Sequence, residues 1–256
     1  MAVCSRMPTV AGLGLFLVLA SGAVARAGEI KVLSTVGVKS VVEEMAPQYE
    51  QKTGHKLAIT FGLATTLKRQ IEGGEAFDLA IMTGAVADEL IKQGKLVAAT
   101  RTNVARGGIG IAVRAGAPKP DIGSVDALKR ALFAAKSITY NKEGGSGIYF
   151  AALLERLGIA EDLKPKTKLA TGNAPELVAA GEAEMVVQLI TELLPVRGIE
   201  LVGPLPAEVQ NYIVLVAGVG TQAKEPAIAK DFLQFLTGPA AGPVIKAKGL
   251  EPGGSS

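Results

Sequence analysis

The sequence predicts an α/β fold made of two lobes joined by two crossover strands. Three observations predict it. Strand and helix patterns alternate along nearly the whole chain. The strand patterns are continuous apolar runs, typical of parallel strands with both sheet faces covered. Two β-rich runs, at residues 107–113 and 212–217, stand where the chain would leave one α/β series and return to it.

The first α/β series begins at residue 30. Apolar runs at 30–36, 57–61 and 77–82 predict three strands, and apolar residues at helical spacing predict helices over 38–51, 65–72 and 86–93. Threonines are expected to cap the second helix, and Gly73 and Gly74 to end it. The glycine-rich run 107–113 then predicts a strand that leaves the first lobe.

The second series predicts helices over 125–134, 148–157 and 174–180, with strands over 137–140 and 184–189. Residues 212–217 form a strongly β-type run that would cross back. Helices over 226–236 and 239–248 would complete the first lobe, and we expect a frayed tail at 252–256. We therefore expect two Rossmann-like lobes, the first from residues 28–108 and 216–256 and the second from residues 109–215.

The N-terminus has the pattern of a secretory signal peptide over residues 1–27. Arg6 precedes an apolar run at 10–20, and Ala25-Arg26-Ala27 fits a cleavage site. The run is shorter than the roughly 20 residues of a membrane span, although an anchor is the alternative. Cys4, the only cysteine, would leave with the peptide, so we expect a periplasmic protein without disulfides.

Composition narrows the function classes. The 27 basic residues nearly balance the 24 acidic ones, and no basic stripe with interleaved aromatics is present, so we expect no nucleic-acid partner. With His55 as the one histidine, clusters of histidine and cysteine ligands for a metal are excluded. The run Gly144-Gly-Ser-Gly147 lacks the lysine of a nucleotide-binding loop, and we expect no cofactor.

Four turns are small, hydroxyl-bearing or glycine-rich, at residues 34–38, 62–66, 144–147 and 171–173. In open α/β sheets, ligands bind beyond the carboxyl ends of the strands, near helix N-termini whose free N–H groups favour anions. These turns therefore predict a site for a small anion. The alternative is that each turn merely caps its helix.

Several segments resemble the molybdate-binding protein family of ABC importers. They are Thr65-Thr-Leu-Lys-Arg-Gln-Ile-Glu-Gly-Gly74 with Phe77-Asp-Leu-Ala-Ile81, Gly147-Ile-Tyr-Phe150 with Leu157-Gly158, and Lys230-Asp-Phe-Leu-Gln-Phe-Leu-Thr-Gly-Pro239. The resemblance covers residues 29–251. It implies a type II periplasmic binding fold with the ligand between the lobes, an ABC permease and ATPase as partners, and a monomer.

The resemblance also implies a set of ligand-binding positions, namely Val36, Gly37, Ala64, Thr65, Thr66, Gly145, Ser146, Gly147, Thr171, Gln188 and Leu189. The family's first-turn serine falls on Gly37 and its tyrosine near Leu189, so two neutral donors are missing. Each hydrogen bond to a charged group is worth about 1.5–3 kcal/mol. We therefore expect an organic carboxylate rather than molybdate or tungstate, and Lys39, Arg69 and Lys142 would add positive charge if they point inward.

An enzyme is the alternative. Aconitate isomerase activity is associated with periplasmic proteins that resemble this family. That reaction shifts a proton along a tricarboxylate and needs an acid/base with a tuned pKa and donors for the developing negative charge. The candidates near the third turn are Lys142, Glu143 and Tyr149, with Tyr140 as a further tyrosine. The alternative for Glu143 is an exposed loop position with no role in the reaction, which is the commoner case for a glutamate. A serine-histidine-aspartate triad is not expected with His55 alone.

Overall fold

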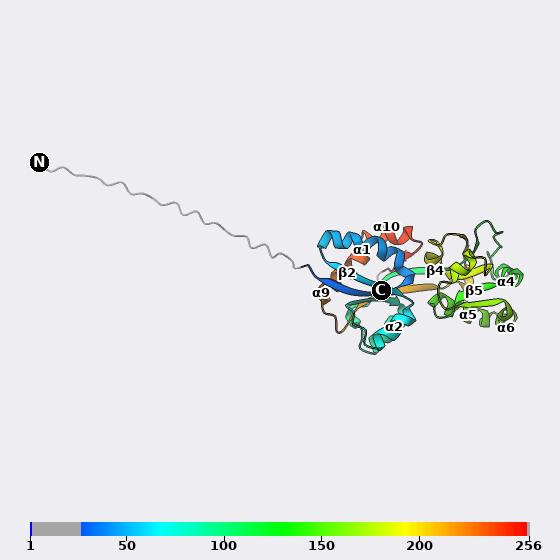
Figure 1. Cartoon of the computed structure of the whole chain (residues 1–256), viewed down its shortest axis with the longest axis horizontal. Coiled ribbons are helices and arrows are strands. Elements are labelled where there is room, and N and C mark those ends of the chain that lie inside the picture. Colours follow the sequence, from blue (N-terminus) through cyan, green and yellow to red (C-terminus); the bar gives the residue numbers. More distant parts are fainter. Residues whose placement is uncertain (2–26, 255–256) are drawn as a thin grey trace.

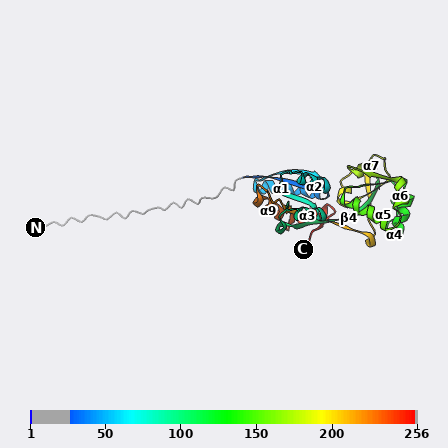
Figure 2. The ribbon, with the colours of Figure 1, turned by 90° about the horizontal axis from the view of Figure 1, so that it is seen from below.

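The computed structural model describes Met1 and residues 27–254. The expected signal peptide and Cys4 therefore lie outside the described residues, apart from Met1 and Ala27. Two α/β halves lie side by side, and β4 (Thr102–Arg114) runs from one into the other (Figures 1 and 2). Within the described part of the chain, no helix combines the length and apolarity that crossing a bilayer requires.

The strands follow the order β2-β1-β3-β9-β4-β7-β5-β6, and β8 and β10 both pair with β4. The first half contains β1, β2, β3, β9 and β10, and the second contains β5 to β8. Pairing is parallel among β1, β2 and β3 and among β5, β6 and β7, whereas β4 and β9 run antiparallel to their neighbours. The remaining strand bounds are β1 (Glu29–Thr35), β2 (Lys56–Gly62), β3 (Leu79–Thr83), β5 (Ile138–Asn141), β6 (Thr167–Ala170), β7 (Met185–Leu189), β8 (Ile199–Pro204), β9 (Tyr212–Val219) and β10 (Glu251–Pro252).

Helices cover both faces of each half. In Figure 1, α1 and α10 lie on one side of the first half and α2 on the other. The α-helices are α1 (Lys39–Thr53), α2 (Ala64–Glu72), α3 (Gly84–Lys92), α4 (Val125–Ala134), α5 (Gly145–Arg156), α6 (Ala160–Leu163), α7 (Ala174–Ala179), α8 (Ile190–Leu193), α9 (Pro226–Thr237) and α10 (Ala241–Ala247). Short 3₁₀ helices are η1 (Val36–Val38), η2 (Ala98–Thr100), η3 (Lys164–Lys166) and η4 (Ala207–Val209).

Four apolar clusters hold these layers together, one on each face of each half. In β1, Val32 packs with α1, α9 and α10, whereas its neighbour Leu33 packs with α2 and α3. In β4, Ile111 packs with α4 and α5, and its neighbour Ala112 with α7 and α8. Successive strand residues point to opposite faces, so a strand covered on both faces must be apolar throughout. This packing explains the continuous apolar runs and confirms the predicted α/β fold.

The chain passes between the halves along β4. Its pairing with β9 ends at Gly108, and its pairing with β7 begins at the next residue, Ile109. The loop before Tyr212 brings the chain back to β9, which pairs with both β3 and β4. The two connections position the strand ends and helix N-termini of one half opposite those of the other.

Most predicted elements are present with shifts of one or two residues at their ends, but several details differ. The expected threonine caps of α2 are wrong, because Leu63 is its N-cap residue and no side chain caps it. The tail is ordered as far as the strand β10, where Pro252 pairs with Ala105, while residues 255–256 lie outside the described chain. Two strands, β6 and β8, were not predicted from the sequence.

Candidate functional site

Three cavities lie in a row along the seam between the two halves. We call them the large cavity (about 1040 Å³), the central cavity (about 20 Å³) and the side cavity (about 530 Å³). The large and central cavities share lining residues, namely Ala64, Thr83, Gly145 and Ile213. The central and side cavities share Val36, Leu63, Asn141, Gln188 and Glu192. The row is therefore one continuous cleft with a narrow middle that has room for about one water molecule.

Helix N-termini surround the narrow middle of the cleft. The first residues of α2 and α5 line it, together with Thr83, which directly precedes α3, and η1 leads into α1 at its edge. None of these four α-helices has a side-chain cap. The same holds for α6 to α10, and among the described α-helices α4 alone is capped, by Ser124 Oγ, which accepts from the Ala127 N–H at 3.2 Å. Uncapped N-termini present free N–H donors and a partial positive charge, which together favour an anion.

The turn before α5 is organised by Asn141, the buried last residue of β5. Its Oδ1 accepts from the backbone N–H groups of Glu143 (2.9 Å) and Gly144 (3.2 Å), and its Nδ2 donates to the carbonyl of Gly172 (2.7 Å). This one side chain therefore joins the third and fourth turns that the sequence singled out, and it fixes the direction in which α5 begins.

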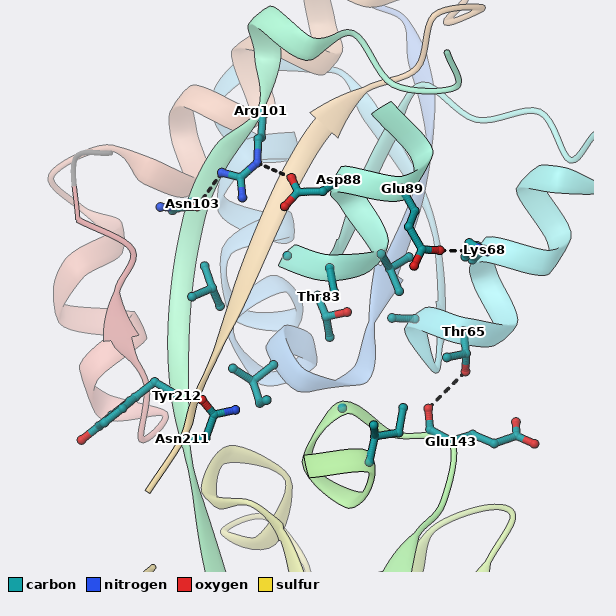
Figure 3. A pocket seen from close by; sticks show the side chains of 18 of the residues that line it. Thr65, Lys68, Thr83, Asp88, Glu89, Arg101, Asn103, Glu143, Asn211 and Tyr212 are labelled. Carbon is teal, nitrogen blue, oxygen red and sulfur yellow. Dashed lines mark hydrogen bonds and ion pairs between the residues drawn. The ribbon is translucent and has the colours of Figure 1, made fainter. Parts of the chain in front are cut away.

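Three polar contacts cross the seam. The Thr65 hydroxyl donates to the Glu143 carbonyl at 3.2 Å, as Figure 3 shows. The Arg69 guanidinium lies 3.4 Å from the Glu143 carboxylate. At the other side of the cleft, the hydroxyls of Ser40 and Thr191 are 3.4 Å apart. These contacts hold the two halves against each other, so the structure has its cleft closed.

A buried glutamine and a carboxyl face the cleft from the second half. Gln188, at the end of β7, is 6% exposed, and its Nε2 donates to the carboxylate of Glu192, four residues later in the chain. Its Oε1 is the one buried side-chain polar atom, among the described residues, that has no hydrogen-bond partner. Burial raises the pKa of Glu192 to about 7, opposed by the hydrogen bond from Gln188, which lowers it.

Gly37 of the first half lies against Leu189 of the second half. A Cβ atom at Gly37 would lie 3.1 Å from Leu189 Cδ1, 3.4 Å from Leu215 Cδ2 and 3.5 Å from Glu192 Oε1. An apolar side chain and a carboxyl therefore occupy the space next to this turn.

The sequence profile of the bacterial extracellular solute-binding proteins matches residues 30–251. The chain belongs to this family. Aconitate isomerase from a Pseudomonas species is 31% identical to this solute-binding protein, over 96% of this chain and 97% of that one. The molybdate-binding protein ModA of Azotobacter vinelandii is 28% identical, over 96% of each chain. The solved periplasmic molybdate-binding protein of Azotobacter vinelandii superposes with a TM-score of 0.73 at 22% identity, covering 86% of this chain and 98% of that one.

The family model and the molybdate-binding relatives confirm the resemblance predicted from the sequence. Within the cleft of this solute-binding protein, the expected ligand-binding residues divide among the cavities. The central cavity contains Val36, Ala64, Gly145, Ser146, Gln188 and Leu189. The large cavity adds Thr65, and the side cavity adds Thr66 and Thr171.

Three expected site residues of the solute-binding protein, Gly37, Gly147 and Tyr149, do not line the cavities. A Cβ at Gly147 would lie 1.8 Å from the Asn141 carbonyl oxygen, so this glycine lets α5 pack directly onto the end of β5. The Tyr149 hydroxyl donates to the Val209 carbonyl at 2.8 Å and accepts from Arg156. Lys142 and Glu143 do line the large cavity.

The large cavity carries charges of both signs. Lys68 lies 2.9 Å from Glu72 and 3.1 Å from Glu89, and Arg101 donates to Asp88 at 2.7 Å (Figure 3). These cations of the solute-binding protein are therefore engaged by carboxylates of their own half. In the side cavity, Lys39 is the basic residue, at the start of α1.

Sequence reasoning missed Glu192 and Asn141. Glu192 belongs to α8, a four-residue helix whose segment carries no periodic pattern from which to predict it. Asn141 directly follows a predicted strand, and a polar residue at the carboxyl end of a buried strand is the signal that would have found it.

Proposed function

We propose that this protein binds a small organic carboxylate between its two lobes and delivers it to an ABC permease and ATPase. In this account residues 1–27 direct export to the periplasm, and the lobes comprise residues 28–108 with 216–256, and residues 109–215. The protein acts as a monomer, without a cofactor. The membership in the solute-binding family supports the transport role.

The observation that carries the proposal is the ring of uncapped helix N-termini around the central cavity. Helices α2 and α5 begin there, and α3 begins directly after Thr83 in the cavity wall, all three without a side-chain cap. Their free N–H groups would otherwise stay unsatisfied in the closed cleft, and an anionic oxygen satisfies several of them together. Ser146, 4% exposed, adds a hydroxyl from the first turn of α5.

The shape of the cleft favours a carboxylate over a tetrahedral oxyanion. The central cavity has room for about one water, and Leu189 lies against Gly37 where the molybdate-type site would have its donors. A planar carboxylate needs less widening there than a tetrahedral ion. The side cavity of about 530 Å³ then takes the rest of the molecule, with Lys39, Ser40 and Thr66 in its lining to meet further polar groups.

A thermal-shift series tests this function. The chain without residues 1–27 is heated with molybdate, tungstate, sulfate, phosphate, citrate, trans-aconitate and cis-aconitate. A ligand that binds the native state raises the melting temperature by mass action. We expect one or more of the carboxylates to raise it. Stabilisation by molybdate alone would show that the missing donors do not decide the specificity.

The second candidate function is isomerisation of a tricarboxylate. Glu192 favours it, because a cleft carboxyl with a pKa near 7 can both accept and return a proton at neutral pH. The aconitate isomerase relative supports the same reaction class. One proton would leave a methylene carbon, the double bond would shift, and a proton would add at the other end of the allyl system, without a net change in composition.

Turnover separates the two functions. Trans-aconitate is incubated with the purified protein, and the cis isomer is followed by chromatography from pH 6 to pH 9. The isomerase account expects catalytic formation of the cis isomer, lost in Glu192→Gln. Binding without turnover over this range leaves the transport account alone.

A further inference from the structure

A carboxyl lies inside a site otherwise built for an anion. Glu192 lines both the central and the side cavity, and its Oε1 is 3.5 Å from the position of a Cβ at Gly37, close beside the turn that begins η1. An ionised carboxylate at this position would repel the carboxylate ligand proposed above. A protonated carboxyl would instead supply one O–H donor.

The hydrogen bonds of Gln188 depend on whether Glu192 is protonated. Its Nε2 donates to Glu192, and its buried Oε1 has no partner among the described residues. This arrangement suits an ionised Glu192, which can only accept hydrogen bonds, and it directs an acceptor oxygen of the amide elsewhere in the cleft. When Glu192 is protonated, the amide can turn over. Its Oε1 then accepts from the carboxyl, and its Nε2 becomes a free donor.

We propose that Glu192 and Gln188 form a proton-dependent donor pair, and that binding of an anionic ligand takes up one proton on Glu192 while the Gln188 amide turns to donate to the ligand. The inference rests on the proposed function, because it concerns the same cleft. The two N–H groups of the turned Gln188 amide would replace the two donors that the molybdate-type site has and that Gly37 and Leu189 lack. No covalent bond forms or breaks in this step besides the O–H bond made with a solvent proton.

The other charged residues around Glu192 are paired with one another or lie far from it. The protonation of Glu192 therefore decides the state of the Glu192–Gln188 pair. The charged residues that share the side cavity with it are Lys39 and Glu43, which form an ion pair of 3.6 Å with each other. The strand β7 and the helix η1 carry no charged residue. On the neighbouring strands β4 and β8, Arg106 pairs with Glu251 (2.5 Å), Glu200 pairs with Lys119 (3.2 Å), and Arg114 is at the far end of β4, beside Gly181.

The coupling between proton binding and ligand binding determines how the affinity changes with pH. Burial raises the pKa of Glu192 to about 7 in the free protein, and a bound anion would raise it further. Only the protonated fraction then binds tightly, so the observed affinity falls as the pH rises through this value. For a ligand that stays fully ionised, the association constant should fall roughly 50-fold between pH 7 and pH 9, because the protonated fraction falls from about one half to about one hundredth.

The test is calorimetric titration with trans-aconitate, and in parallel with cis-aconitate, in buffers of different ionisation enthalpy at pH 7, 8 and 9. The wild type should take up close to one proton per ligand at pH 8 and lose affinity as described. Glu192→Gln cannot ionise yet retains an amide donor. It should take up no proton and bind with an affinity that changes less than about threefold over this range.

Glu44→Gln is the matched control, since it makes the same change on α1 at a residue that pairs with Lys248 at 2.7 Å and lines none of the three cavities. It should keep the proton uptake and the pH profile of the wild type. If Glu192→Gln and the wild type show the same proton uptake and profile, the inference is overturned and the proposed function stands. If none of the carboxylates in the thermal-shift series binds at any pH, the proposed function fails, and the inference falls with it.

Discussion

The Thr65 hydroxyl of the first half donates a hydrogen bond to the Glu143 backbone carbonyl of the second, across 3.2 Å. Thr65 is in the first turn of α2, and Glu143 precedes the first turn of α5. The contact therefore joins two of the helix N-termini that we propose hold the ligand, and it can form only when the cleft is closed.

Removing this contact should weaken ligand binding. Thr65→Val keeps the shape of the side chain but removes the donor, which contributes about 0.5–1.5 kcal/mol to the closed state. We expect a loss of affinity of about two- to tenfold by titration calorimetry, mainly through faster dissociation. Thr221→Val is the control, since Thr221 donates to the Gly94 carbonyl away from the cleft. Equal affinities of wild type and Thr65→Val would show that the contact does not stabilise closure.

Glu192 should give the folded protein a distinctive pH dependence. Its pKa is raised from 4.5 to about 7 by burial, so the folded state binds more protons than the unfolded state between these values. The free energy of unfolding should therefore decrease as the pH rises from about 4.5 to about 7, by about 2–3 kcal/mol from this group. Glu192→Gln should remove this decrease in urea denaturation, and Glu44→Gln should retain it. Parallel curves for wild type and Glu192→Gln would contradict the assignment.

The Gln188 amide should lower the stability of the free protein and increase its affinity for the ligand. Its Oε1 is buried without a partner, a situation that costs about 1–3 kcal/mol. Gln188→Met removes the amide with little change in volume. We expect a melting temperature at least as high as that of the wild type together with at least a tenfold loss of affinity for the ligand. Gln234→Met, at an exposed position of α9, should change neither. Unchanged affinity in Gln188→Met would exclude a contact between the amide and the ligand.

Gly147 is expected to matter for folding rather than for ligand contact. An added Cβ would lie 1.8 Å from the Asn141 carbonyl oxygen, and backbone must move to relieve that overlap. Gly147→Ala should lower the free energy of unfolding by about 3 kcal/mol or more. Gly172→Ala, where a Cβ meets no atom within 4 Å, should stay within about 1 kcal/mol of the wild type. Equal stabilities of the two variants in urea would contradict this packing.

Periodicity predicted most of the fold because long apolar runs and amphipathic helices carry strong local signals. The pattern at 125–134 matches α4 at both ends, since Ser124 caps it from its own sequence neighbourhood. The strands β6 and β8 are mostly only partly buried, so their patterns are weak. The capping of α2 was wrong for a related reason. Thr65 forms its hydrogen bond with Glu143, 78 residues away, and no local pattern reveals such a partner.

The same distinction applies to the site. The turns at 62–66 and 144–147 were found from composition, because small and hydroxyl-bearing residues are needed where a helix starts near a ligand. Glu192 was missed, because a single glutamate in the sequence is most often a solvated one. Its importance comes from burial and from Gln188, which the fold supplies.

Competition titration between trans-aconitate and molybdate tests the central claim most directly. The chain without residues 1–27 is titrated with each ligand at pH 7, and then with each in the presence of an excess of the other. We predict that the carboxylate binds with a dissociation constant in the micromolar range or below and that molybdate neither binds nor competes. Tight binding of molybdate, with no heat from trans-aconitate, would contradict the account.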